Sequence, residues 1–280
     1  MHGAVLRLYH LILLTGNTKI LFMSEKKINT TESVIKNRKM LFLLALMTVL
    51  AVTANAQQYD PESDFSVSPL NGGKSLRITG YKGSKRTVSI PPAINGVPVT
   101  SIGDSAFSNR ASLTRINIPN SVTSIGNEAF YRCTSLTRIT TRNSVTSIGH
   151  YAFYGCTSLP SVNIPNSVTG IGNYAFSGCT GLTSVTIGRN VARIGDLAFS
   201  HCDGLTSVII GRGVTRIGDL AFYGCTSLAS VTFQSAIASR YLNYSAFPGD
   251  LHAKFYAADE ANGTPGVYTR NPTKDEWMKQ

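Results

Sequence analysis

The sequence predicts a repeat solenoid: coils that stack on one another, with a parallel β-sheet on one face and short helical or irregular segments on the other. Three sets of residues recur at a fixed step of 23 residues, which is typical of a solenoid whose repeat forms one coil. The sets are cysteines, phenylalanines and isoleucines that precede a glycine. They comprise Cys133, Cys156, Cys179, Cys202 and Cys225; Phe107, Phe130, Phe153, Phe176, Phe199 and Phe222; and Ile102, Ile125, Ile148, Ile171, Ile194 and Ile217.

The unit that begins at Leu113 shows what one coil contains. Alternating apolar residues predict a strand over Arg115–Ile118, and the following Pro-Asn-Ser predicts a turn. Val122 and Ile125 return to the interior, and Asn127–Tyr131 is long enough for about one helical turn. Fixing the backbone costs about 1–2 kcal/mol per residue, so one coil cannot fold alone. We therefore expect about seven coils over residues 74–248 that fold as one array with a cap at each end.

The cysteines need a separate interpretation. Their odd number and regular spacing argue against a disulfide framework, although neighbouring coils would bring successive cysteines within bridging range. No Cys-x-x-Cys motif occurs, which argues against a metal or catalytic role. We expect all five to be buried free thiols that act as small apolar residues.

Two adjacent units carry a resemblance to a known family. The segment from Cys156 to Gly178, CTSLPSVNIPNSVTGIGNYAFSG, resembles the BspA-like class of leucine-rich repeats, and CTSLTRITTRNSVTSIGHYAFYG before it is a close variant. The phrase AF-x-x-C-x-x-L recurs in successive coils. One departure is Thr141-Arg142, which replaces the Ile-Pro of Ile164-Pro165 and would put a hydroxyl in the core. We expect a weak joint there.

The N-terminal part of the chain has the pattern of an export signal. Basic residues over 36–39 precede an apolar run over 40–52, and small residues end at Ala56. This order predicts a signal peptide over residues 36–56, cleaved after Ala56. The run is short for a bilayer span, which takes about 20 residues, so we expect no stable membrane span after cleavage; an uncleaved anchor is the alternative. Residues 1–35 are then not part of the native protein.

Both ends of the array are predicted to be capped. Residues 57–73 are mostly polar and predict a loose lead-in. Ser75–Tyr81 and Thr87–Ile90 predict a hairpin that closes the first coil. Residues 249–280 form the predicted C-terminal cap, with a final strand at Leu251–Tyr256 and an aromatic tail that ends near Trp277.

The composition gives no support for an enzyme. Beyond residue 56, the three histidines show no metal-binding spacing, and no nucleophile elbow or phosphate-binding loop occurs. Asp104, Glu128, Asp196 and Asp219 recur at related positions and suit turns. We expect no enzymatic activity, no cofactor and no metal. Residues 57–280 carry 19 Lys/Arg against 13 Asp/Glu, a dilute excess that does not predict nucleic-acid binding.

Two surfaces are candidates for binding. Outward strand positions align in two polar columns, and four arginines form a predicted cationic patch, with an ordinary solvated surface as the alternative. The columns are Arg115, Arg138, Ser161, Ser184, Ser207 and Ser230, and Asn117, Thr140, Asn163, Thr186, Ile209 and Thr232; the patch is Arg189, Arg193, Arg212 and Arg216. Arg115, Asn117, Arg138 and Asn163 are the candidate residues on the strand face.

The proteins that this chain resembles imply a function. They are exported bacterial proteins, secreted or at the cell surface, and act as adhesins that engage host matrix proteins or other cells. The resemblance therefore implies a macromolecular partner, either protein or glycan and possibly host extracellular matrix. The alternative is a passive envelope or periplasmic scaffold with no host ligand.

Overall fold

The computed structural model describes residues 59–140, 143–271 and 276–280. Residues Ala56–Gln280 form one compact unit, and every described residue belongs to it. The predicted signal peptide and its cleavage site therefore lie outside the described residues. So do Thr141 and Arg142, at the predicted weak joint.

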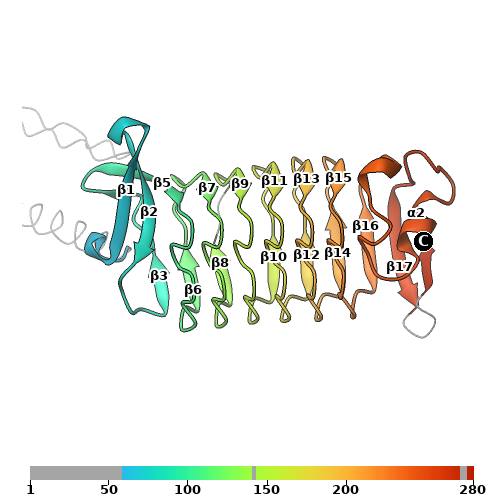
Figure 1. The fold of residues 1–280 in the computed structure, drawn as a ribbon, viewed down its shortest axis with the longest axis horizontal. Helices are drawn as coiled ribbons and strands as arrows, with labels where there is room; N and C mark the ends of the chain where they lie inside the picture. The colour runs from blue at the N-terminus through green and yellow to red at the C-terminus, as the bar shows by residue number, and fades with distance from the viewer. Residues whose placement is uncertain (1–58, 141–142, 272–275) are drawn as a thin grey trace, which may run out of the picture. The chain divides into compact units, whose positions relative to one another are not determined.

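Each coil contributes two short strands, so the array carries two parallel ladders. The first ladder comprises β3 (Thr87–Ser89), β6 (Arg115–Asn117), β8 (Arg138–Thr140), β10 (Ser161–Asn163), β12 (Ser184–Thr186), β14 (Ser207–Ile210) and β16 (Ser230–Phe233). The second comprises β5 (Val97–Ile102), β7 (Ser124–Ile125), β9 (Ser147–Ile148), β11 (Gly170–Ile171), β13 (Arg193–Ile194) and β15 (Arg216–Ile217). Figure 1 shows the coils following one another in chain order. The predicted solenoid is confirmed, and the second ladder is an addition that the sequence pattern did not predict.

The segment expected to form a helical turn is a turn of another kind. Glu128 has a φ of 55°, in the left-handed region. The N–H groups of Glu128 and Phe130 donate to the carbonyls of His150 and Ala152 in the next coil, at 2.8 and 2.7 Å. The prediction of a helical turn at Asn127–Tyr131 is wrong because Glu128 adopts a left-handed backbone conformation, and the turn bonds to the next coil instead.

The core is organised around a column of phenylalanine rings. From Phe107 to Phe222, successive rings lie 5.1–5.2 Å apart at their centroids and within 3–14° of parallel. The column continues through Tyr81 to Phe65 at one end and to Phe247 at the other. Aromatic contact therefore links one cap to the other through the interior of the array.

The N-terminal cap corrects two predictions. It consists of η1 (Glu62–Asp64), β1 (Phe65–Leu70), η2 (Asn71–Gly73), β2 (Ser75–Tyr81) and β4 (Ala93–Ile94). β1 pairs antiparallel with β2, so the prediction of a loose lead-in is wrong over β1. The predicted hairpin is wrong as well, because β2 pairs with β5 while β3 pairs with β6. The two strands start separate ladders instead of pairing with each other.

The C-terminal end corrects one more prediction. It consists of η3 (Ser239–Tyr241), α2 (Leu251–Tyr256), β17 (Gly266–Asn271) and β18 (Glu276–Lys279). The segment predicted as a final strand is helix α2, in which Leu251 and Phe255 are buried at helical spacing. β17 pairs antiparallel with β16, and β18 pairs with β17. The side chains of Tyr268 and Trp277 are fully buried in this end of the array.

Candidate binding surfaces

Equivalent outward residues of the first ladder stack directly on one another. Ser161, Ser184, Ser207 and Ser230 are paired in register, and so are Arg115 with Arg138. The second column follows the same register from Asn163 through Thr186 and Ile209 to Thr232. The sequence pattern therefore identified the columns correctly within each run of paired strands.

The first ladder is interrupted between β8 and β10. Among the described residues, one sheet ends with β8 and another begins with β10, and no ladder joins them. On the second ladder β9 still pairs with β11, and the rings of Phe153 and Phe176 remain 5.1 Å apart. The coils therefore separate on one face only, at the boundary where β8 leads into Thr141.

Pro160 removes one hydrogen bond at this interruption. The N–H of Thr137 donates to the Thr114 carbonyl at 2.9 Å, and that of Thr183 donates to the Pro160 carbonyl at 2.9 Å. Pro160 occupies the equivalent position between them but has no N–H to give to Thr137. Pro160 directly precedes β10 and was not among the predicted site residues, although a proline beside a strand is a recognisable signal in a sequence.

A cleft of about 810 Å³ lies at the interruption. Its floor is apolar and includes Ile139, Val162, Ile164 and Phe153. Ile139 and Val162 are half-buried, whereas the equivalent Ile116 and Val185, Val208 and Val231 of the other coils are fully buried. The volume falls within the range of about 300–1,000 Å³ that is typical of ligand pockets.

The cleft collects four of the eight predicted site residues. Arg138, Asn163, Arg189 and Arg212 line it, and no Asp or Glu is among its described lining residues. Arg193 and Arg216 are instead paired in register on the second ladder, and Arg115 lies on β6, outside the cleft. The four arginines predicted as one patch are therefore divided between the cleft and the second ladder.

The arginines of these surfaces carry unpaired charge. Over the described ranges, the ion pairs are Lys85 with Asp60 and Lys254 with Asp250. Asp196 and Asp219 do not balance the patch with an ion pair; the Asp196 carboxylate accepts the Asp219 N–H at 3.0 Å. The same column continues upstream, where the Asp104 carboxylate accepts the Asn127 N–H at 2.7 Å. These acidic residues serve the turns, in keeping with the interpretation from sequence.

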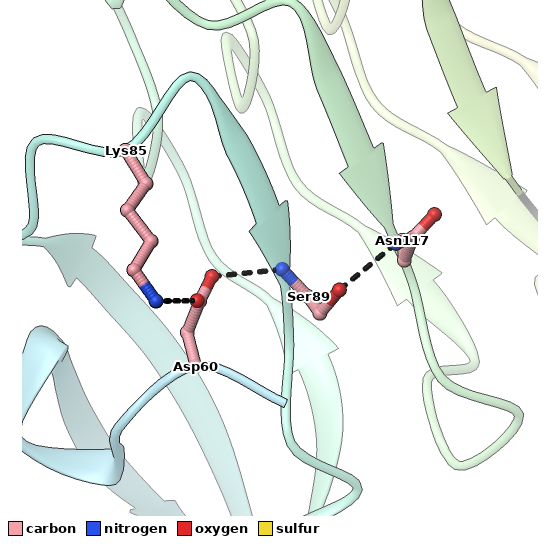
Figure 2. A network of polar contacts seen from close by, with 4 residues as sticks. All are labelled: Asp60, Lys85, Ser89 and Asn117. Carbon is pink, nitrogen blue, oxygen red and sulfur yellow. Dashed lines mark hydrogen bonds and ion pairs between the residues drawn. The ribbon is translucent and has the colours of Figure 1, made fainter. Parts of the chain in front are cut away.

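Asn117 belongs to the N-terminal end of the array and not to the cleft. Its Nδ2 donates to the Ser89 hydroxyl at 2.9 Å, and the Ser89 N–H donates to buried Asp60 at 2.8 Å (Figure 2). Asp60 also pairs with Lys85 Nζ at 2.6 Å, a hydrogen bond that raises the pKa of the Lys85 amine. This chain of contacts ties the lead-in to the first strands.

Comparison with known proteins identifies the repeat. The profile of the BspA type leucine rich repeat region matches residues 100–229 in six copies. The crystal structure of a leucine rich repeat protein from T. pallidum is 35% identical, with a TM-score of 0.61, and the match covers 62% of this chain and 81% of that one. The chain belongs to the BspA-type leucine-rich-repeat family.

A second structure extends the comparison of this BspA-type protein. A leucine rich cell surface protein from Faecalibacterium prausnitzii is 28% identical, with a TM-score of 0.49, and the match covers 79% of this chain and 60% of that one. No curated protein matches. Membership of the family makes the chain a repeat scaffold for protein interaction.

The cysteines of this BspA-type protein have a structural role. All five are buried and free, as predicted, and each Sγ donates to a phenylalanine carbonyl 26 residues earlier at 3.1–3.3 Å. Burial raises the pKa of the Cys133 and Cys179 thiols to about 12. At neutral pH such thiols are protonated and poor nucleophiles.

Two features are absent from the residues that the structure describes. No group of three or more His, Cys, Asp or Glu side chains in this part of the chain could hold a metal ion. No helix within the same ranges has the length and apolar character needed to cross a membrane.

Proposed function

We propose that this BspA-type protein is exported and binds another protein at the cell surface or in the surrounding medium. The observation that carries the proposal is the cleft between β8 and β10, where an apolar floor meets the unpaired arginines Arg138, Arg189 and Arg212. The signal-peptide pattern over residues 36–56 supports export.

The surface beyond the cleft extends the proposed contact. The Ser and Thr positions on β10 to β16, from exposed Ser161 and Thr186 to half-buried Ser207 and Ser230, offer hydroxyl groups for many weak hydrogen bonds. Arg115 on β6 adds positive charge that steers an acidic partner toward the array, whereas Arg193 and Arg216 on the second ladder lie outside the proposed contact. Host matrix proteins are the partner class that the family suggests for an adhesin, and a sulfated glycan would exploit the same charges.

A binding assay with matched variants tests this function. The purified chain is immobilised and exposed to a panel of purified matrix proteins at low and high salt. Binding that weakens with salt and is lost in the double variant Arg189→Glu/Arg212→Glu supports the cleft as the site. The double variant Arg193→Glu/Arg216→Glu has the same charge change outside the cleft and is expected to retain most of the binding.

Fractionation of the producing cell tests the location. Protein that is released, or that is degraded when protease is added to intact cells, supports a surface role. A pool that is protected on intact cells, together with no binding to any matrix protein, would favour the passive envelope or periplasmic scaffold and overturn the proposal.

A further inference from the structure

The interruption of the first ladder leaves two strand edges facing the cleft. In the described part of the chain, β8 is the last strand of its sheet and β10 is the first of the next. The Thr137 carbonyl, which would accept the missing N–H of Pro160, receives no hydrogen bond from a described donor. Unpaired strand edges are templates for the addition of another strand.

The cleft floor matches one face of such a strand. Side chains of a β-strand alternate between its two faces. A strand that lies along the cleft would direct every second side chain onto Ile139, Val162 and Ile164. Apolar residues at those positions would complete the burial of Ile139 and Val162, whose equivalents in the other coils are fully buried.

The cleft rim matches the other face. Arg138 comes from β8, Arg189 from the turn after β12, and Arg212 from the turn one coil later. All three are exposed, and none forms an ion pair within the described residues. Carboxylates on the outward positions of a bound strand would give these arginines partners, and basic residues there would be repelled.

We propose that the cleft binds an extended segment of a partner protein, with alternating apolar and acidic side chains, that pairs with a free edge of β8 or β10. This inference rests on the proposed function, because it names the form in which a protein partner enters the site. The partner contributes main-chain hydrogen bonds to the edge, apolar side chains to the floor and carboxylates to the rim.

A synthetic probe tests the mode of binding directly. The probe is a fluorescein-labelled peptide of eight alternating valine and glutamate residues, titrated with the purified chain and followed by fluorescence anisotropy. Three matched peptides serve as controls. In the first, lysine replaces every glutamate. The second carries N-methyl groups on the backbone amides of one strand edge, and the third carries them on the amides of the opposite edge. We expect binding of the acidic peptide, no binding of the lysine peptide, and loss of binding with one of the two methylated peptides.

Two variants of the chain complete the test. Pro160→Thr supplies the N–H that the other coils use, so it is expected to close the ladder and weaken binding of the acidic peptide by at least about tenfold. Arg212→Glu is expected to weaken it by a similar factor, whereas Arg216→Glu, outside the cleft, should change it less than about threefold.

The outcomes separate this inference from the proposed function. Strand addition would be overturned if all four peptides bound equally well. It would also be overturned if the Pro160→Thr variant bound the acidic peptide as tightly as the unaltered chain does. If the chain still captured a matrix protein under those conditions, the proposed function would stand without this mode of binding. Conversely, the expected peptide behaviour without capture of any matrix protein would support strand addition and count against the matrix partner.

Discussion

The carbonyl of Pro160 accepts two hydrogen bonds from Thr183, one from its N–H and one from its hydroxyl, both at 2.9 Å. On its other side Pro160 has no N–H to return to Thr137. The residue is therefore joined to the following coil and not to the preceding one. The first ladder is divided into two sheets beside this residue, while the second ladder and the aromatic column remain continuous.

Pro160→Thr should close this interruption with little change in overall stability. One new backbone hydrogen bond contributes about 0.5–1.5 kcal/mol, and loss of the rigid proline costs about 0.4–1 kcal/mol through the unfolded state. These effects nearly cancel in the free energy of unfolding. The sensitive measurement is amide hydrogen exchange, which should slow at Ile139 and Ser161, whose N–H groups face the gap in the register of the other coils.

The reciprocal variant Thr183→Pro is the control for that prediction. It removes the bond from Thr183 to Pro160 and should open a second interruption, between β10 and β12. Exchange should then accelerate along both strands, and the free energy of unfolding should fall by about 1–3 kcal/mol. Slow exchange in Thr183→Pro would show that a missing N–H does not separate the coils.

Phe199→Ala should destabilise the whole array. Phe199 is fully buried between Phe176 and Phe222, with both ring centroids at 5.1 Å. Removal of a buried phenylalanine ring costs about 3–5 kcal/mol. Urea unfolding followed by circular dichroism and by fluorescence of Trp277, the single tryptophan, would measure the loss. Tyr223→Ala, at a ring that is 51% exposed, should cost less than about 1 kcal/mol and serves as the control.

Two glycines of the same coil should respond differently to alanine. A Cβ on Gly172 would lie 2.5 Å from the backbone carbon of Gly149, so the coils would have to separate. A Cβ on Gly170 would come no closer than 3.9 Å to any atom outside its chain neighbours. Gly172→Ala should therefore lower the free energy of unfolding by about 1–3 kcal/mol, and Gly170→Ala should leave it within about 0.5 kcal/mol. Equal effects would contradict the close stacking of these turns.

The buried thiols should make stability depend on alkaline pH. Burial raises the pKa of Cys179 from its ordinary 9.0 to about 12, so the folded chain keeps this proton when the unfolded chain loses it. Stability from this source is fully present below pH 9 and falls as the pH rises toward 12. The urea concentration at the unfolding midpoint should therefore decrease when the pH is raised from about 8 to about 10. The decrease should be smaller in Cys179→Ala. A native chain that reacts with a thiol reagent as readily as the denatured one would contradict the burial.

The parts of the fold that repeat were predictable, and the parts that occur once were not. Phe130, Phe153 and Phe176 could be placed on one another because identical residues at one spacing occupy identical positions. The ends of the array offer no such redundancy. Whether β2 pairs with β3 or with β5 depends on contacts distant in sequence, and the residues of α2 have both strand and helix patterns over six positions.

The candidate site shows the same division. Register alone brought Arg189 next to Arg212, but their meeting with Arg138 and Asn163 depends on the cleft between β8 and β10. Pro160, which lacks the N–H that equivalent residues donate beside the cleft, is conspicuous only once the coils are aligned with their hydrogen bonds. A residue that removes a hydrogen bond from the neighbouring coil is hard to detect when each sequence position is considered by itself.

The uniform step between coils has a consequence for how such a gene diverges. Unequal recombination between neighbouring units would delete or duplicate whole windings without disturbing either end of the array, since equivalent residues of successive windings pair in register over most of the array. The proline-marked gap would then shift relative to the two ends. Related chains with fewer or more windings would thus carry this gap at different distances from their two caps.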